Sequence, residues 1–403
     1  MTDLIELNGR RYRRPKRPTV IICADGCDPE YVARGIADGI LPTIAAFARD
    51  GYFGTADAAM PTFTNPNNVS IVTGAPPSVH GVAGNYYLDR DTGREIMVTD
   101  EQLMRSETIL ALMGRAGVKT AAITAKDKLR RLLGRNLDGI CFSSECADAE
   151  IEAMVGRGKP DMYSADLSLF VLDAGIKLLE RGAAELLYLS LSDYVQHAHA
   201  PGVPEADAFH RAIDDRVRRL VELGAVVGLV ADHGMNDKAW PNGEPNVIFL
   251  EDELNDRFGD GAVRVICPIT DPFVRHHGAL GSFVRVYARS AANIPSLMIA
   301  SAELPGVAVV LDAASAARRF ETPLDREADF VVLGDDNTAV GASHAEHDLS
   351  ALAGHRLRSH GGLGEQAVPF ILSRPLTPEY REIAAARRLR NYDIFDFALN
   401  GAA

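Results

Sequence analysis

Short apolar runs recur along the chain and alternate with stretches of helical periodicity, and this pattern limits the fold more than any other feature. The first run, residues 20–24, is apolar throughout, as expected for a strand covered on both faces. Strands separated by helices are typical of a mainly parallel sheet. Four more strands are expected on the same grounds, at 119–124, 186–191, 225–231 and 367–372. The sequence therefore predicts an α/β fold with a mainly parallel central sheet flanked by helices.

This alternation changes after about residue 245. Residues 245–354 contain several β-rich pieces with only short helices between them. We interpret this region as a smaller α+β cap domain, inserted into a core formed by residues 1–244 and 355–403.

The composition excludes several classes of protein. Of the 403 residues, 47% are apolar and 24% are charged, as in ordinary globular proteins, and no apolar run approaches the roughly 18 residues of a membrane-spanning helix. The net charge of -13 argues against nucleic acid or an anionic membrane as a partner. Because the basic start lacks the apolar stretch of a secretory signal, we expect a cytoplasmic location. We interpret the five scattered cysteines as buried thiols rather than disulfides or metal ligands.

Three apolar runs lead into an aspartate. Asp25 and Asp193 follow two of them, and Asp232 ends a third with His233 directly after it. In an open parallel sheet, ligands bind beyond the carboxyl ends of the strands. One aspartate in such a place is more often a helix cap or turn residue. Several together would repel one another unless a cation neutralised them, so the pattern favours a metal site.

Two histidines extend this candidate site. His197 lies four residues after Asp193, a spacing that puts both side chains on one face of a helical turn. His360 lies in a Ser-His-Gly-Gly segment, whose glycines let the backbone approach a site closely. A lone histidine in such a loop is more often a surface residue. Beside the aspartates, both are suitable ligands for zinc, and iron or manganese would also be tolerated.

Thr64 is the candidate nucleophile. Residues 61–69 are typical of a loop entering a helix, with Pro66 in the first turn, where its missing N–H costs nothing. The free N–H groups and the dipole of such a helix N-terminus favour an oxyanion. An ordinary capping threonine is the alternative. Coordination to a metal is what would turn this weakly acidic hydroxyl into an alkoxide near neutral pH.

Four motifs together resemble the alkaline phosphatase superfamily, especially its nucleotide pyrophosphatase-like branch. They are TFTNPNNVSIVTG around Thr64, SDYVQH, ADHGM and SHGG, and they occur in the order expected for that branch. The resemblance implies an alkaline phosphatase-like core that holds two zinc ions. It assigns Asp193, His197 and His360 to one zinc and Asp25, Asp232 and His233 to the other, with Thr64 at the second metal. It also implies that Asn85 binds a phosphoryl oxygen, although a turn residue after Gly84 is the alternative.

A pair of lysines indicates which class of substrate the site would bind. Lys126 and Lys128 follow the predicted strand at 119–124, so one or both should reach the same rim. Two ammonium groups there would suit a small substrate with a second negative charge. The alternative is a solvated helix face shared with Arg130 and Arg131. The arrangement resembles the phosphonoacetate hydrolase family, in which paired lysines hold the substrate carboxylate.

This resemblance implies zinc-dependent cleavage of a carbon–phosphorus bond, part of phosphonate degradation. Thr64 would attack phosphorus, expelling acetate as its enolate and leaving phosphothreonine, which water then hydrolyses to phosphate. The expected partner is a small anionic phosphonate, and a homodimer is compatible with the sequence. Arg275 and His277 in the cap are weaker candidates for contact with the substrate.

Three other functions stay open at this point. A nucleotide pyrophosphatase or phosphodiesterase of the same branch would need an apolar or aromatic slot for a base, which Tyr86, Tyr87 or Tyr194 would provide. A phosphomonoesterase is the second alternative. The third, a metal-binding or carbohydrate-binding protein that has lost turnover, is disfavoured because every expected ligand position is filled.

Overall fold

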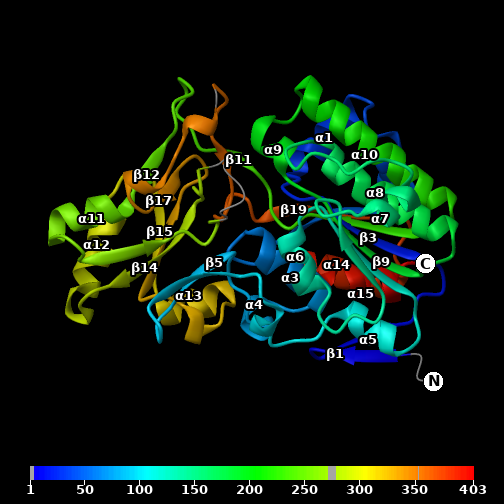
Figure 1. Cartoon of the computed structure of the whole chain (residues 1–403), viewed down its shortest axis with the longest axis horizontal. Helices are drawn as coiled ribbons and strands as arrows, with labels where there is room; N and C mark the ends of the chain where they lie inside the picture. The colour runs from blue at the N-terminus through cyan, green and yellow to red at the C-terminus, as the bar shows by residue number, and fades with distance from the viewer. Residues whose placement is uncertain (1–3, 271–277, 353) are drawn as a thin grey trace.

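The chain folds into two lobes (Figure 1), in a computed structural model that describes residues 4–270, 278–352 and 354–403. The larger lobe is built on an eight-stranded sheet. Its strands, in spatial order, are β20 (Leu389–Arg390), β4 (Tyr52–Asp57), β19 (Ala367–Leu372), β10 (Val226–Val230), β3 (Thr19–Cys23), β9 (Leu186–Ser190), β7 (Thr120–Thr124) and β8 (Ile140–Ser143). All five strands expected from the apolar runs are present.

Most of this sheet is parallel, as predicted. From β10 through β3, β9 and β7 to β8 every pairing is parallel. Only β19 runs the other way, antiparallel to both β10 and β4. The chain returns from the smaller lobe at the rim where β3 and β10 end, so β19 has to cross the sheet in the opposite direction. The sheet is therefore mixed, because β19 runs antiparallel to its two neighbours.

Helices cover both faces of the sheet (Figure 1). On one face, α1 (Pro29–Ala37), α2 (Pro42–Asp50), α8 (Asp166–Glu180) and α10 (Pro204–Glu222) pack together. On the other face lie α3 (Thr64–Thr73), α5 (Ile109–Arg115), α6 (Asp127–Leu133) and α15 (Ile394–Asp396). The apolar stripe of α8, including Leu167, Phe170 and Val171, is fully buried against the sheet, as its helical spacing predicts.

The smaller lobe has its own sheet and its own apolar core. Four antiparallel strands are ordered β13 (Val263–Ile266), β14 (Phe283–Ala288), β16 (Phe330–Gly334) and β15 (Val307–Asp312). Helices α11 (Leu250–Phe258), α12 (Ile294–Ala302) and α13 (Ala313–Phe320) pack against them. The cap boundaries at 245 and 354 stay a prediction.

One hairpin from the first part of the chain reaches across to the smaller lobe. Its strands, β5 (Tyr86–Asp89) and β6 (Arg94–Met97), pair with each other, and β5 contacts β13. Tyr86 and Leu88 pack against the buried side chains of Ile266 and Tyr287. Arg264 also forms an ion pair with Glu95 of the hairpin. No sequence pattern indicates this crossing, because the partners are far apart in the chain; Arg264 and Glu95 are separated by 169 residues.

The structure bears on two expectations drawn from composition, one about membrane-spanning helices and one about the cysteines. Among the described residues, no helix combines the length and the apolar character needed to cross a membrane; the cytoplasmic location stays a prediction. The interpretation of all five cysteines as buried thiols is wrong in part, because Cys146 is exposed and Cys141 is only partly buried.

A fully buried ion pair joins the two lobes near the rim of the large sheet. Lys238 Nζ lies 2.8 Å from Glu365 Oε1, and both side chains are completely inaccessible. The same ammonium group donates to the carbonyl of Asp336 in the smaller lobe, and Glu365 Oε2 accepts from the N–H of Gly362, two residues after His360. The pair therefore ties the segment that carries His360 to both lobes.

We expect Lys238→Met to destabilise the protein by about 3–5 kcal/mol, because it leaves the Glu365 carboxylate buried without its cation. Thermal unfolding should show a lower midpoint for this variant, and Lys238→Met combined with Glu365→Gln should recover part of the loss. Lys177→Met, at an exposed ion pair with Glu180, serves as the control and should change the midpoint little. Equal midpoints for the single and double Lys238 variants would contradict this account.

Candidate metal centre and active site

The six predicted metal ligands converge at the carboxyl end of the large sheet. Asp25 and Asp232 follow β3 and β10, which are neighbouring parallel strands. Asp193 and His197 lie at the start and on the second half of the short helix α9 (Tyr194–Ala198), directly after β9. His360 follows β18 (Arg358–Ser359). All six side chains are buried.

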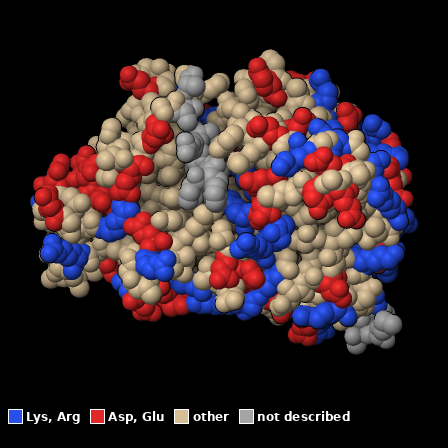
Figure 2. Space-filling model, viewed as in Figure 1, with Lys and Arg blue, Asp and Glu red and all other residues tan. Residues whose placement is uncertain are grey.

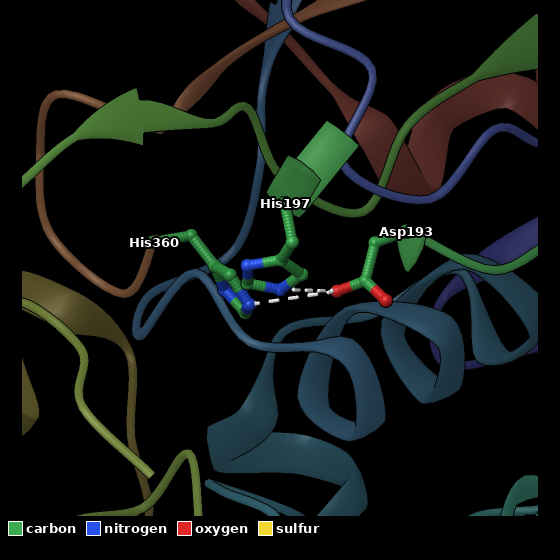
Figure 3. Close-up of side chains that lie close together, drawn as sticks. All are labelled: Asp193, His197 and His360. Carbon is green, nitrogen blue, oxygen red and sulfur yellow. Dashed lines mark hydrogen bonds and ion pairs between the residues drawn. The ribbon is translucent and has the colours of Figure 1, made fainter. Parts of the chain in front are cut away.

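Two groups of ligand atoms are close enough to hold a cation. Asp193, His197 and His360 form one group, and Asp25, Asp193 and His233 form the other, with the ligand atoms of each group within 4.8 Å of one another. Figure 3 shows His197 and His360 both directed at Asp193, whose Oδ2 lies 2.9 Å and 3.8 Å from their Nε2 atoms. Asp193 is common to both groups, so its carboxylate lies between the two candidate positions.

Asp232 lies beside the second group without belonging to it. Its Oδ2 is 3.8 Å from His233 Nε2, but both of its oxygens already accept hydrogen bonds. Oδ1 accepts from the backbone N–H groups of Gly26 and His233, and Oδ2 accepts from the Asn68 amide. An ionised carboxylate has about four lone-pair positions, so these bonds orient Asp232 and still leave it able to bind a metal.

All three histidines are oriented in the same way. Nδ1 of His197 lies 2.7 Å from the carbonyl oxygen of Arg358, Nδ1 of His233 lies 2.9 Å from that of Gly234, and Nδ1 of His360 lies 2.8 Å from that of Thr62. A carbonyl can only accept, so each Nδ1 carries a proton and donates. In the neutral ring Nε2 then keeps its lone pair, and each Nε2 faces the carboxylates. Histidine ligands of metals are commonly fixed by this second hydrogen bond.

The charges of this cluster are not balanced by the side chains alone. Burial raises the pKa of Asp25 well above its usual range, and the neighbouring Asp193 and Asp232 raise it further. Burial would lower the pKa of His233, but Asp232 and the contact with Asp25 raise it to about 10. Among the described residues, Asp25 Oδ1 and His233 Nε2 have no well-aligned hydrogen-bond partner, although they lie only 3.2 Å apart. Carboxylates and imidazoles in this arrangement fit a divalent cation such as zinc.

Thr64 and Asn85 lie against the same centre. Thr64 is the first residue of α3 and its only residue that is not fully buried. The Asn85 side-chain oxygen accepts the backbone N–H of Asn65 at 3.0 Å. That bond fixes the amide, so its NH2 group is directed away from Asn65. Both residues line one pocket together with Asp25, Asp193 and His360.

Both predicted lysines line this pocket too. Lys126 is the residue before α6, and Lys128 lies in the first turn of that helix. An adjoining pocket is lined by the same two lysines and Arg131. Figure 2 shows basic side chains gathered beside the junction of the lobes, where α6 lies in Figure 1. The pocket therefore combines acidic and imidazole groups on one side with ammonium groups on another.

Apolar side chains and one hydroxyl complete the pocket. They are Thr124, Leu129 and Leu191 from the larger lobe and Ile269 from the smaller one. No tyrosine is among the described residues that line it, so Tyr86, Tyr87 and Tyr194 provide no slot for a base there. Arg275 and His277 lie outside the described residues.

Asn68 is a functional candidate that the sequence reasoning missed. Its amide donates to Asp232 Oδ2 and to the carbonyl of Thr64, both at 3.0 Å. Its oxygen accepts from the hydroxyls of Tyr188 and Ser190 at 2.7 and 2.8 Å. Asn68 therefore couples the position of a candidate metal ligand to that of the candidate nucleophile. The signal was the spacing, since Asn68 is four residues after Thr64 and thus on the same helix face.

A sequence model of the type I phosphodiesterase/nucleotide pyrophosphatase family matches residues 19–362, most of the chain and every candidate ligand. The chain belongs to this family. Members of the type I phosphodiesterase family are metalloenzymes with an alkaline phosphatase-like fold, which agrees with the candidate metal centre.

Solved structures of phosphonoacetate hydrolase from Sinorhizobium meliloti are similar over the whole length of both chains. The complex with phosphonoformate has 44% sequence identity and a TM-score of 0.95, and the complex with phosphonoacetate has 44% and 0.94. This likeness confirms the predicted fold and the prediction that the chain is an enzyme related to phosphonoacetate hydrolase.

Two curated relatives match only part of their own length. An uncharacterised pyrophosphatase/phosphodiesterase of Schizosaccharomyces pombe is 22% identical over 244 residues, which is 59% of this chain and 47% of that protein. Phosphonoacetate hydrolase of Penicillium oxalicum is 69% identical over 29 residues, which is 7% of this chain and 40% of that protein. The chain thus aligns with about half or less of each curated relative.

We expect zinc to stabilise the chelator-treated protein, because a cation between the buried carboxylates relieves their repulsion and binds only the folded state. The midpoint of thermal unfolding should rise on addition of zinc, and metal analysis should find two ions per chain. Asp25→Asn and His360→Ala should each reduce the rise. Asp215→Asn, an exposed carboxylate on α10, should leave it unchanged. A midpoint that does not respond to zinc would contradict the assignment.

Proposed function

We propose that this protein hydrolyses the carbon–phosphorus bond of phosphonoacetate to acetate and phosphate. The observation that carries the proposal is the pocket itself, in which Lys126 and Lys128 lie with Thr64 and the candidate metal ligands. A substrate with a phosphonate at one end and a carboxylate at the other needs both kinds of group at once. The likeness to the S. meliloti enzyme over the whole chain supports the same substrate.

We propose Asp193, His197 and His360 as ligands of one metal ion, and Asp25, Asp232 and His233, with Thr64, as ligands of the other. Two zinc ions in these positions would neutralise phosphoryl oxygens and lower the pKa of an adjacent hydroxyl or water. The roles of the side chains follow from this arrangement.

Thr64 is the proposed nucleophile. Its hydroxyl gives up its proton to solvent, Oγ attacks phosphorus in line, and the carbon–phosphorus bond breaks with its electron pair moving to carbon. That pair spreads into the neighbouring carboxylate as an enediolate, which takes a proton from solvent to become acetate. Water then cleaves the phosphothreonine ester, which returns the proton to Thr64 and releases phosphate.

Lys126, Lys128 and Asn85 stabilise the charges that develop. The two ammonium groups pair with the substrate carboxylate, where negative charge builds up as the bond breaks, so they act on the transition state more than on the ground state. The Asn85 NH2 group, oriented by the bond from Asn65, donates to a phosphoryl oxygen.

Zinc-loaded protein should release phosphate and acetate from phosphonoacetate in equal amounts. Lys126→Ala and Lys128→Ala should each lower kcat/KM for phosphonoacetate by about 10- to 100-fold, as expected for loss of a charge-assisted hydrogen bond. Both should keep activity on bis-nitrophenyl phosphate, which has no carboxylate. Thr64→Ala should abolish both activities, while Lys177→Ala on the exposed surface of α8 should change neither.

A phosphodiesterase or phosphomonoesterase of the same family is the competing hypothesis. Faster turnover of bis-nitrophenyl phosphate or of a simple monoester than of phosphonoacetate, on one enzyme preparation, would favour it. The pocket argues for the phosphonate, since the described residues that line it offer lysines and no phenylalanine, tyrosine or tryptophan ring.

A further inference from the structure

A second buried ion pair lies inside the smaller lobe. Arg285 on β14 and Glu327 just before β16 have side chains that are 1% and 0% exposed. The guanidinium makes two contacts with the carboxylate, Nε to Oε1 at 2.5 Å and Nη2 to Oε2 at 3.3 Å. Glu327 also accepts from the hydroxyl of Thr322 and from the N–H of Ala328. The orientation of Arg285 is therefore fixed.

The remaining nitrogen of Arg285 reaches out of this lobe. Its Nη1 donates to the backbone carbonyl of Ala83 at 3.1 Å. Ala83 belongs to the segment of the larger lobe that connects α4 (Pro77–His80) to β5, two residues before Asn85. A side chain of the smaller lobe thus holds the backbone next to the proposed phosphoryl-binding residue.

The same segment touches the smaller lobe at a second point. The Asn85 N–H donates to the carbonyl of Pro268 at 2.8 Å, and the Val98 N–H donates to the Asn85 carbonyl at 2.8 Å. At Gly84, a Cβ would lie 2.8 Å from Pro268 Cβ and 3.4 Å from Arg285 Nη1, so the backbone lies directly on the smaller lobe. Figure 1 shows the hairpin that follows, beginning with β5, at the junction of the lobes.

We propose that Arg285 and Glu327 are positioning residues for the Asn85 amide. This inference rests on the proposed function, in which Asn85 binds a phosphoryl oxygen. Two groups of the smaller lobe, the Pro268 carbonyl and the Arg285 guanidinium, fix the backbone on either side of Gly84. The hydrogen bond from the Asn65 N–H then sets the orientation of the Asn85 side chain. Because a donor acts on developing charge only when held in place beforehand, a loosened segment weakens the phosphoryl subsite while the metal ligands stay where they are.

The test is a double-mutant cycle between Arg285→Met and Asn85→Ala, with inorganic phosphate as the probe. Phosphate binding to zinc-loaded protein, measured by calorimetry, should weaken about 10-fold in Arg285→Met. The same change should have less than about a twofold effect in the Asn85→Ala background, because the group it positions is already absent. Zinc content should stay at the native value. Glu327→Gln should act in the same direction as Arg285→Met.

Two further variants separate positioning from general stability. Arg285→Lys keeps a donor for the Ala83 carbonyl and should restore part of the affinity; the cycle can be run with it if Arg285→Met does not fold. Arg257→Met removes an exposed ion pair with Glu303 in the same lobe and should leave phosphate binding unchanged.

The inference is overturned if Arg285→Met weakens phosphate binding by the same factor with and without Asn85, or does not weaken it. Absence of phosphate binding by the unmutated zinc-loaded protein would overturn it as well. These outcomes differ from failure of the proposed function. If the native protein binds phosphate but does not cleave phosphonoacetate, the proposed substrate is wrong. The double-mutant cycle still measures whether Arg285 positions Asn85 for phosphate binding.

Discussion

Buried negative charge at one rim of the large sheet is the constraint on which the rest of the structure depends. Asp25, Asp193 and Asp232 lie too close together, and too far from water, to be stable without compensation. The histidines supply only part of that compensation, because the acids raise the pKa of His233 to about 10 but burial holds the pKa of His360 well below its usual range. The fold therefore brings together a candidate site for divalent cations, and hydrogen bonds orient Asp232 and the three histidines within it.

The smaller lobe contributes to this site without supplying any of the six candidate ligands. Ile269 closes the pocket, Arg285 and Pro268 hold the segment that carries Asn85, and the carbonyl of Asp336 receives the buried Lys238. Met60 and Phe63, which precede the candidate nucleophile in the chain, belong to the apolar core of this lobe. Residues of both lobes therefore pack together around the pocket.

The sequence alone located five of the eight strands of the large sheet and the three aspartates that follow such strands, for one physical reason. Continuous apolar runs identify strands buried on both faces, and polar residues at their ends must meet at one rim. Features that depend on distant parts of the chain have no such local pattern in the sequence. The reversed direction of β19 follows from where the smaller lobe returns the chain, and Asn68 is recognised only once Asp232 is seen beside it. The exposure of Cys146, which lies between Glu145 and Ala147, likewise depends on how the loop after β8 lies on the fold.

The late position of His360 and β19 in the chain has a consequence for biosynthesis. Thr64 and five of the six candidate ligands have been synthesised once residue 233 is made, but the group formed by Asp193, His197 and His360 lacks a member until the whole smaller lobe has followed. At that stage β4 and β10 also lack β19, the strand that separates them. In a nascent chain the group of Asp193, His197 and His360 and the central sheet are therefore both completed only near the end of translation, whereas the group of Asp25, Asp193 and His233 is already present in the chain.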